Sequence, residues 1–597
     1  MRLDTSKQRR IPAWFDTACS RNLFDREPAT SARLVSLQKL AKVALWAPLS
    51  LLALSLAAPS YIQPLFVHGT YYLLWVLILC WIGTHLHAVR DVRREAVLAW
   101  VKENWPGLVV ALAVTLVAGL AVHPALRVLS DEANLVGTSK NLFASKTATF
   151  TVSGKNYYDS YWDVDVAIDR RPTLFPFLIS LIHAARGYSY ENVFLLNLLL
   201  LPAFVLVSYR LAKALGGETF GVVASLLVVA HPITLISARS GGFDFITTLF
   251  ALLVIKNALD CIEQPSPVRL AMLWTNLCMF AELRYETALF IAPVLGFLFL
   301  FRLLSCKLLR PFAFIYALTP AYLAPRIWQG ILRGNVPEQE PGAITFSVEN
   351  FWHNAREYFK PLFAPLDSYS SHSAVVIGLG IVGGGSWLRW IRGRALARSW
   401  GDARRKFAWF VGAWLLCQSA IVFSYVWGRA QYPSAARLFV PIDTFFSFAA
   451  AWVLGRTRAV VPVLLAAAVV LSQVPVASQH RMLNRLTQTR ENATTWRFFE
   501  GLHEKRILIV TDHPNLYTIM DYGAMTFESA NRDPYLATAF ERRLFYDLYL
   551  IQQLKLSTKE PLPGYELWPA RKRETVLEFQ NDADVLIRIS RLAHDDL

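Results

Sequence analysis

The sequence predicts a polytopic α-helical membrane protein, and three observations support this fold class. Hydrophobic residues make up 54% of the 597-residue chain and charged residues only 17%, whereas soluble domains carry about 25% charged residues. Aromatic residues reach 13%, including 19 Trp, which is typical of a chain with aromatic belts at two membrane interfaces. Apolar windows long enough to cross a bilayer, about 20 residues each, recur from residue 42 to residue 478.

We place about thirteen transmembrane helices, with boundaries that are uncertain by about four residues. Several windows are short or closely spaced. The expected spans are 42–59, 70–87, 107–127, 191–212, 219–238, 244–258, 268–283, 285–304, 311–329, 373–390, 407–426, 438–455 and 459–478.

The basic residues predict the orientation. Lys and Arg gather in alternate loops, such as "RDVRREAVLAWVK" (90–102) and "RWIRGRALARSWGDARRK" (389–406), as the positive-inside rule requires. Residues 1–41 are polar and Arg-rich without an apolar signal-peptide region, so we expect a cytoplasmic N-terminal tail. The net charge of +16 therefore sets orientation and indicates no nucleic-acid partner. This register puts the long segments 128–190 and 330–372, and the C-terminus, on the outer side of a cell inner membrane.

The C-terminal residues 479–597 turn polar and predict a small periplasmic α/β domain. We expect strands at "RILIVTD" (506–512), "TVLEF" and "DVLIRIS", and a helix near 534–555. Within the first outer segment, the apolar part of "RRPTLFPFLISLIHAARG" (170–187) is too short to span comfortably, so we expect a juxtamembrane helix in the interface. If 172–187 does span, the topology after it inverts.

The predicted outer edge of the membrane collects charged residues, and these are the candidate site. Arginine suits phosphate because its planar fork bonds two oxygens at once, and charges near bilayer depth suggest function. Simpler explanations are a solvated helix end, a local Arg239–Asp244 ion pair, a self-satisfied "ELRYE" turn (282–286) and snorkelling arginines. The residues concerned are Asp131, Glu132, Arg170, Arg171, Arg239, Asp244, Arg284, Glu286 and Arg437.

Four motifs together resemble the GT-C class of polyprenyl-phosphate-sugar-dependent glycosyltransferases, especially lipid A aminoarabinose transferases and protein O-mannosyltransferases. An outer "DE" (131–132) follows an early span, and a basic-Pro segment then opens an apolar helix that ends in Gly. A Pro-containing span leads into "RSGGFD" (239–244), and "RYE" (284–286) follows in the next outer turn. The similarity covers roughly residues 107–305 and, more loosely, the spans to about 478.

The resemblance implies a GT-C fold and transfer of a sugar, by inversion at the outer face, from a polyprenyl-phosphate-linked donor. The acceptor it implies is an envelope glycan, a glycolipid, lipid A or a protein, with membrane lipids as further partners. Asp131 would be the catalytic base and Asp244 a second carboxylate. Arg170, Arg171 and Arg239 would hold the donor phosphate, with Glu132, Arg284, Glu286 and Arg437 supporting. We expect no obligatory metal, although a carboxylate pair beside phosphates can bind a divalent cation.

Two departures from that family matter. Asn134 stands where the aminoarabinose enzymes usually bring an Arg close to "DE", and a basic-flanked hairpin (spans one and two) precedes the family core. Three other functions stay open: a lipid-linked polysaccharide ligase or polymerase, a secondary transporter, and a scaffold with inert spans. A transporter is disfavoured because no internal repeat occurs and the charges lie at the membrane boundary, not at its midplane.

Overall fold

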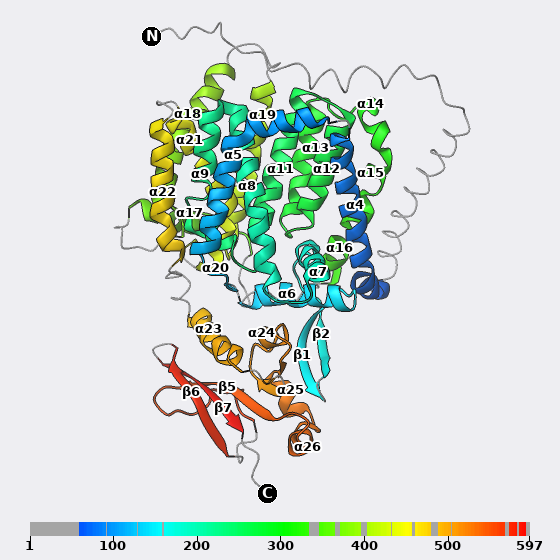
Figure 1. Ribbon diagram of the computed structural model, residues 1–597, viewed down its shortest axis with the longest axis vertical. Coiled ribbons are helices and arrows are strands. Elements are labelled where there is room, and N and C mark those ends of the chain that lie inside the picture. Colours follow the sequence, from blue (N-terminus) through cyan, green and yellow to red (C-terminus); the bar gives the residue numbers. More distant parts are fainter. Residues whose placement is uncertain are drawn as a thin grey trace, which may run out of the picture.

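The computed structural model describes residues 59–592, with gaps at 91, 128, 158–159, 333–344, 364–370, 396–402, 431–432, 456–459, 479–486, 503, 505, 568–571 and 582–583. These residues form a helical bundle with a sheet domain projecting from one end (Figure 1). We call this end the sheet-side end. The tail 1–41 and nearly all of the window 42–59 lie outside the described residues.

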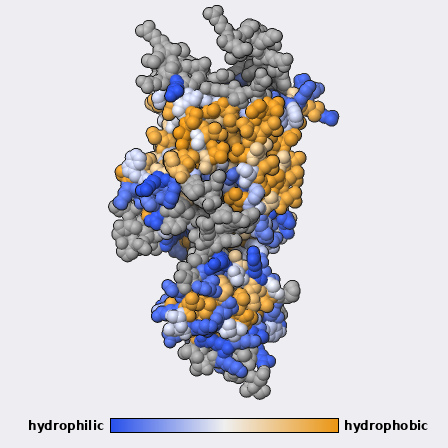
Figure 2. All heavy atoms as spheres, turned by 90° about the vertical axis from the view of Figure 1, so that its left-hand side faces the viewer, coloured by the Kyte–Doolittle hydropathy of each residue, from blue (hydrophilic) through white to orange (hydrophobic). Residues whose placement is uncertain are grey.

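Six helices in the described part of the chain are long and apolar enough to cross a membrane, which makes the chain an integral membrane protein. The helix α11 is 83% buried over its apolar window and forms the centre of the bundle, whereas α22 is only 22% buried there and lies at the periphery. Apolar side chains cover the bundle surface in a broad band (Figure 2). The helices are α4 (Thr70–Val89), α5 (Arg94–Ala121), α8 (Asn192–Gly216), α11 (Asp244–Glu263), α21 (Val440–Leu454, continuous with α20, Pro433–Ala436, and η6, Arg437–Phe439) and α22 (Val460–Ser478).

The other expected spans are shorter or interrupted, so the count of thirteen stays a prediction. The window 219–238 breaks at His231 because Pro232 starts a new helix and lacks an N–H for the preceding one. The window 311–329 divides into several short helices. The remaining bundle helices are η1 (Pro59–Tyr61), α3 (Ile62–Pro64), η2 (Leu65–Gly69), α9 (Glu218–Leu227), α10 (Pro232–Ser237), α12 (Pro267–Ala281), η3 (Thr287–Phe290), α13 (Ile291–Leu300), α14 (Cys306–Leu309), η4 (Arg310–Phe312), α15 (Ala313–Ala317), α16 (Thr319–Leu332), α17 (Val348–Phe359), η5 (Lys360–Leu362), α18 (Ala374–Ala395) and α19 (Ala403–Ser424).

The segment 128–190 forms α6 (Leu129–Ala144), a hairpin of β1 (Phe150–Tyr157) and β2 (Ser160–Ala167), and α7 (Leu174–Arg186). At about 1.5 Å per residue, the 13 residues of α7 are about 20 Å long, which is shorter than the ~30 Å apolar core of a bilayer. Phe177 packs edge-on against Tyr71 and Trp75 of α4, with ring centroids 5.3 and 5.6 Å apart. The helix α7 is thus a packing element against α4 that is too short to cross a bilayer by itself.

In the described part of the chain, the sheet has seven strands in the order β2-β1-β4-β3-β5-β7-β6. The two strands at one end of this order, β2 and β1, come from the segment 128–190, which the sequence alone did not reveal. The helix expected near 534–555 was wrong over its second half, because only α26 is helical and residues 547–555 form β5, an interior strand of the sheet. The domain elements are α23 (Thr487–Glu500), β3 (Ile507–Val510), α24 (Asn515–Thr518), β4 (Gly523–Met525), α25 (Phe527–Arg532), α26 (Leu536–Glu541), β5 (Asp547–Lys555), β6 (Arg573–Gln580) and β7 (Val585–Leu592).

Polar contacts tie α6 to the sheet domain. Lys140 forms an ion pair with Asp521 at 2.7 Å and donates to the carbonyl of Thr518 at 2.8 Å. The amide of Asn515 donates to Asn134 Oδ1 at 2.6 Å. Asn134, which departs from the expected Arg, therefore serves this contact between α6 and the domain. Because α6 lies across the sheet-side end of the bundle, it connects the two parts of the molecule (Figure 1).

Candidate active site

The site is organised around Asp131 in the first turn of α6. Its two carboxylate oxygens accept hydrogen bonds from Arg171, which precedes α7, and from Arg437 in η6. The Asp131 side chain is 23% exposed, so the paired carboxylate is still reachable from outside the protein. Three distant segments of the chain thus meet at one acidic group.

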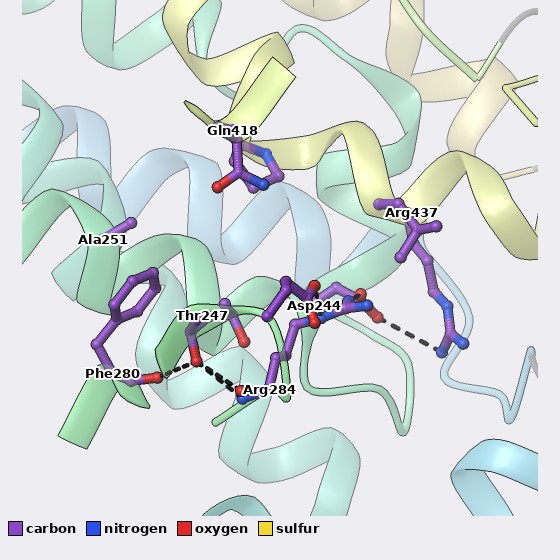
Figure 3. A pocket seen from close by; sticks show the side chains of 11 residues that line it. Asp244, Thr247, Ala251, Phe280, Arg284, Gln418 and Arg437 are labelled. Carbon is purple, nitrogen blue, oxygen red and sulfur yellow. Dashed lines mark hydrogen bonds and ion pairs between the residues drawn. The ribbon is translucent and has the colours of Figure 1, made fainter. Parts of the chain in front are cut away.

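A second carboxylate, Asp244, lies at the start of α11 and also contacts Arg437. Arg284 forms an ion pair with Asp244, and its Nε lies 2.5 Å from Glu286 Oε1. Arg437 Nη1 lies 3.5 Å from Asp244 Oδ2, so Arg437 bridges Asp131 and Asp244. Figure 3 shows Arg284 and Arg437 converging on Asp244. The sequence had assigned Arg437 only a supporting part.

A small cavity opens beside these groups, and its lining combines two arginines, two carboxylates, and neutral polar and apolar side chains. Arg437 Nε and Nη1 are buried and have no hydrogen-bond partner among the described residues. Buried N–H groups are rarely left without an acceptor, so these two donors can bind an anionic group that enters the cavity. The lining includes Asp244, Thr247, Phe280, Arg284, Glu286, Gln418 and Arg437.

Arg171 is held by two residues that the sequence did not single out. Asp169 is 3% exposed and accepts from Arg171 Nη1 at 2.7 Å. Gln329 of α16 donates to the carbonyls of Asp169 and Arg171. Burial raises the pKa of Asp169, although the charge of Arg171 opposes the rise. No motif marks either residue, because each acts only through contacts made in the folded chain.

The adjacent acids of the "DE" motif have different environments. Burial alone would raise the pKa of Asp131, but Arg437 and Arg171 outweigh it and hold that pKa below its ordinary value. Glu132 is only 1% exposed, and burial raises its pKa to about 7. Its Oε2 accepts from the backbone N–H groups of Arg127 at 2.7 Å and Gly241 at 3.0 Å. Glu132 is therefore a buried structural acid and not a solvated helix end.

The other two expected phosphate ligands lie differently. Arg170 is exposed, directly before Arg171. Arg239 donates its Nε to the carbonyl of Val122 at 3.1 Å, which ties its turn to the end of α5. The local Arg239–Asp244 ion pair is not formed among the described residues, since Asp244 pairs with Arg284 and Arg437. Arg437 also occupies the space between Asp131 and Asp244, where a bridging cation would have to lie.

The fold and this cluster define an integral membrane protein with a buried arginine–carboxylate site at one end of its bundle. Two solved structures are similar to it, both of ArnT from Cupriavidus metallidurans, one bound to undecaprenyl phosphate and one in the apo state. The first has 14% sequence identity and a TM-score of 0.48, and the match covers 81% of this chain and 97% of that chain. The second has 14% sequence identity and a TM-score of 0.48, and the match covers 83% of this chain and 98% of that chain. No protein-family model and no curated protein sequence matches this chain.

Proposed function

We propose that the chain is a membrane glycosyltransferase that moves a sugar from a polyprenyl-phosphate-linked donor to an acceptor at the outer face of the inner membrane. The observation that carries this proposal is Arg437, a buried arginine that contacts both carboxylates and keeps two N–H groups without acceptors among the described residues. A lipid phosphate at the end of an apolar bundle would supply those acceptors, while its polyprenyl chain stays in the membrane.

Donor binding would change the partners of the arginines. In the described structure, Asp131 and Asp244 hold Arg171, Arg284 and Arg437 in place. A phosphate that enters the cavity would take N–H groups from Arg437 and Arg284, because charge-assisted bonds to phosphate are strong and geometrically specific. That exchange would release one side of Asp131 toward the acceptor.

The transfer would then be a single displacement. An acceptor hydroxyl oxygen attacks the anomeric carbon, the bond between that carbon and the phosphate oxygen breaks, and the electron pair leaves with the lipid phosphate. The hydroxyl proton passes to Asp131, which first orients the hydroxyl and accepts the proton as the new bond forms. The arginines stabilise the charge on the departing phosphate. One displacement inverts the anomeric configuration.

The acceptor would approach from the sheet-side end, beside α6. An envelope glycan, a glycolipid, lipid A and a protein all present hydroxyl groups that fit this chemistry. The sheet domain contacts α6 through Lys140 and Asn134, so we infer that this domain takes part in acceptor selection.

The test is sugar transfer by the full chain, purified in detergent and supplied with membrane extract as a source of acceptors. Labelled polyprenyl-phosphate sugars should pass label to one acceptor species, whereas the same sugars on nucleotides should not. Label that moves from nucleotide sugars instead, or growth of long polymers from a lipid-linked oligosaccharide, would overturn the proposal and favour a different transferase or a polymerase.

A further inference from the structure

A second polar cluster lies in the bundle apart from the arginine–carboxylate site. It contains Asp443 of α21, His231 at the bend before α10, and His372 just before α18, all of them at most 3% exposed. The His372 Nδ1 lies 2.8 Å from Asp443 Oδ2, and the His231 Nδ1 lies 3.5 Å from Asp443 Oδ1. Tyr358 of α17 also donates its hydroxyl to Asp443 Oδ1 at 2.7 Å.

One contact in this cluster lacks a proton between its two atoms. The backbone N–H of Ser373 donates to His231 Nδ1 at 3.1 Å, so that nitrogen is an acceptor. It faces Asp443 Oδ1, which is also an acceptor. Two acceptor atoms this close repel each other through their partial negative charges, and a cation between them, either a metal ion or a proton, removes the repulsion.

Other atoms of the same segments point to a missing group. His231 Nε2, Thr234 Oγ1 and Ser373 Oγ are buried without hydrogen-bond partners among the described residues. Asp443 is 0% exposed, and its ion-pair partners in the described part of the chain are the two histidines, with no Lys or Arg. Buried carboxylates are paired or coordinate metals, so a cation held between Asp443 and the two histidines would complete this cluster.

We propose that His231, His372 and Asp443 bind a divalent transition-metal ion, with Zn²⁺ as the best fit. Two His nitrogens and one carboxylate oxygen are a common zinc ligand set, and one ligand atom from each residue lies within 4.8 Å of the others. Ligands about 2.0–2.2 Å from a tetrahedral Zn²⁺ are about 3.4 Å apart, close to the 3.5 Å between His231 Nδ1 and Asp443 Oδ1. The ion would bind the lone pair of His231 Nδ1 and so replace the hydrogen bond from the Ser373 backbone N–H.

The ion would join three segments of the bundle. These are the bend between α9 and α10, the residues before α18, and α21, whose continuous helix also carries Arg437. The metal would therefore support the helix that carries Arg437 of the candidate active site. This inference does not depend on sugar transfer, and its test does not use activity.

The experiment measures metal in the full chain purified in detergent, stripped with a chelator and reconstituted with Zn²⁺. We expect about one tightly bound Zn²⁺ per chain and a higher thermal unfolding temperature with Zn²⁺ than without, because the metal binds only the folded state. His372→Ala should lose the metal, whereas His353→Ala, an exposed histidine on α17, should keep it. Wild-type protein that retains no Zn²⁺, or His372→Ala protein that retains as much as wild type, overturns the site and leaves a shared proton as the cation.

A second variant keeps the test decisive if His372→Ala does not fold. His372→Cys retains a metal ligand, and a Co²⁺-loaded thiolate site has a sulfur-to-metal charge-transfer band that the wild type lacks. Appearance of that band would show direct ligation at position 372. Bound Co²⁺ without the band would contradict the proposal.

Discussion

Arg437 is the residue on which the site depends most, because it contacts Asp131 and Asp244 from a third part of the chain. Its planar guanidinium can bond two oxygens in one plane, and a lysine ammonium cannot. A donor phosphate needs that geometry more than it needs a positive charge. The two residues that the sequence resemblance offered for the same task behave differently, with Arg239 tied to the carbonyl of Val122 and Arg170 exposed.

We predict that Arg437→Lys raises the KM for the lipid-linked donor by about 10- to 100-fold, since a charge-assisted hydrogen bond contributes about 1.5–3 kcal/mol. Steady-state kinetics over a range of donor concentrations measures the change. Arg497→Lys on α23, an exposed arginine of the sheet domain, is the matched control. An unchanged KM for Arg437→Lys would remove this residue from the donor site.

The burial of Glu132 leads to a prediction about how stability depends on pH. Its pKa in the folded chain is raised from 4.5 to about 7 by burial, so the folded state holds a proton that the unfolded state has already released. Stability should therefore fall as pH rises from about 4.5 to about 7, by at most about 3.4 kcal/mol at 1.36 kcal/mol per pKa unit. Glu132→Gln keeps an acceptor for the two backbone N–H groups and should flatten this fall. The measurement is the thermal unfolding temperature of both proteins from pH 4.5 to 8, and equal slopes would contradict the assignment.

At the scale of elements, the sequence predicts local features well and long-range contacts poorly. Hydropathy locates α4, α8 and α22 because each is a single apolar run. The residues 547–555 look helical because Leu548, Tyr549, Leu550 and Ile551 are all apolar, and a strand covered on both faces shows no alternation. The pairing of β1 with β4 joins Gly154 to Ala524, a contact that no local pattern reports.

The sequence likewise predicts some residues of the candidate site and misses others. The motifs locate Asp131, Asp244, Arg171 and Arg284, because the GT-C resemblance marks these segments. Asp169 and Gln329 lie 160 positions apart in sequence and meet only in the fold. The bridging position of Arg437 likewise depends on the fold bringing η6 within ion-pair reach of Asp131 on α6 and Asp244 on α11, which no sequence motif reports.

The contact between α6 and the sheet domain gives a prediction at this scale. Lys140 is 12% exposed and bonds Asp521 and the Thr518 carbonyl, and its ammonium lies 4.0 Å from the Tyr161 ring centroid. Lys140→Met keeps the length of the side chain but removes the charge, so it should destabilise the fold by about 1–3 kcal/mol. The control Lys559→Met removes an exposed ion pair with Glu578 and should cost less than about 1 kcal/mol. The thermal unfolding temperatures of both variants measure the difference. Equal shifts in that temperature would show that the Lys140 contact does not stabilise the attachment of the sheet domain.

At the scale of the whole molecule, the arginine–carboxylate site lies at the end of the apolar bundle where α6 lies and the sheet domain projects. Under the proposed function, a single chain would bring the lipid part of a donor and a water-facing acceptor to this place. The sheet draws strands from both the segment 128–190 and the C-terminal residues, so it joins the segment that carries Asp131 to the C-terminal domain. The orientation of the chain in the membrane decides which compartment supplies the acceptor.

We predict that the sheet domain faces the periplasm. A cysteine at Glu528→Cys, whose native side chain is 70% exposed on α25, should react with a membrane-impermeant maleimide in intact spheroplasts. A cysteine at Lys102→Cys, exposed in α5 within the basic segment 90–102, should react only after the membrane is opened. The opposite labelling pattern would contradict this prediction and place the sheet domain on the cytoplasmic side.

The central claim is that Asp131 takes the acceptor proton in a transfer from a lipid phosphate. Its most direct test is the initial rate of sugar transfer by purified Asp131→Asn at saturating donor, with Asp165→Asn on the exposed face of β2 as the control. The account predicts a rate about 10²- to 10⁴-fold below wild type for Asp131→Asn, with near wild-type rates for the control and unchanged folding of both. A rate for Asp131→Asn within about threefold of wild type, well short of the 10²-fold that such a base contributes, would contradict it.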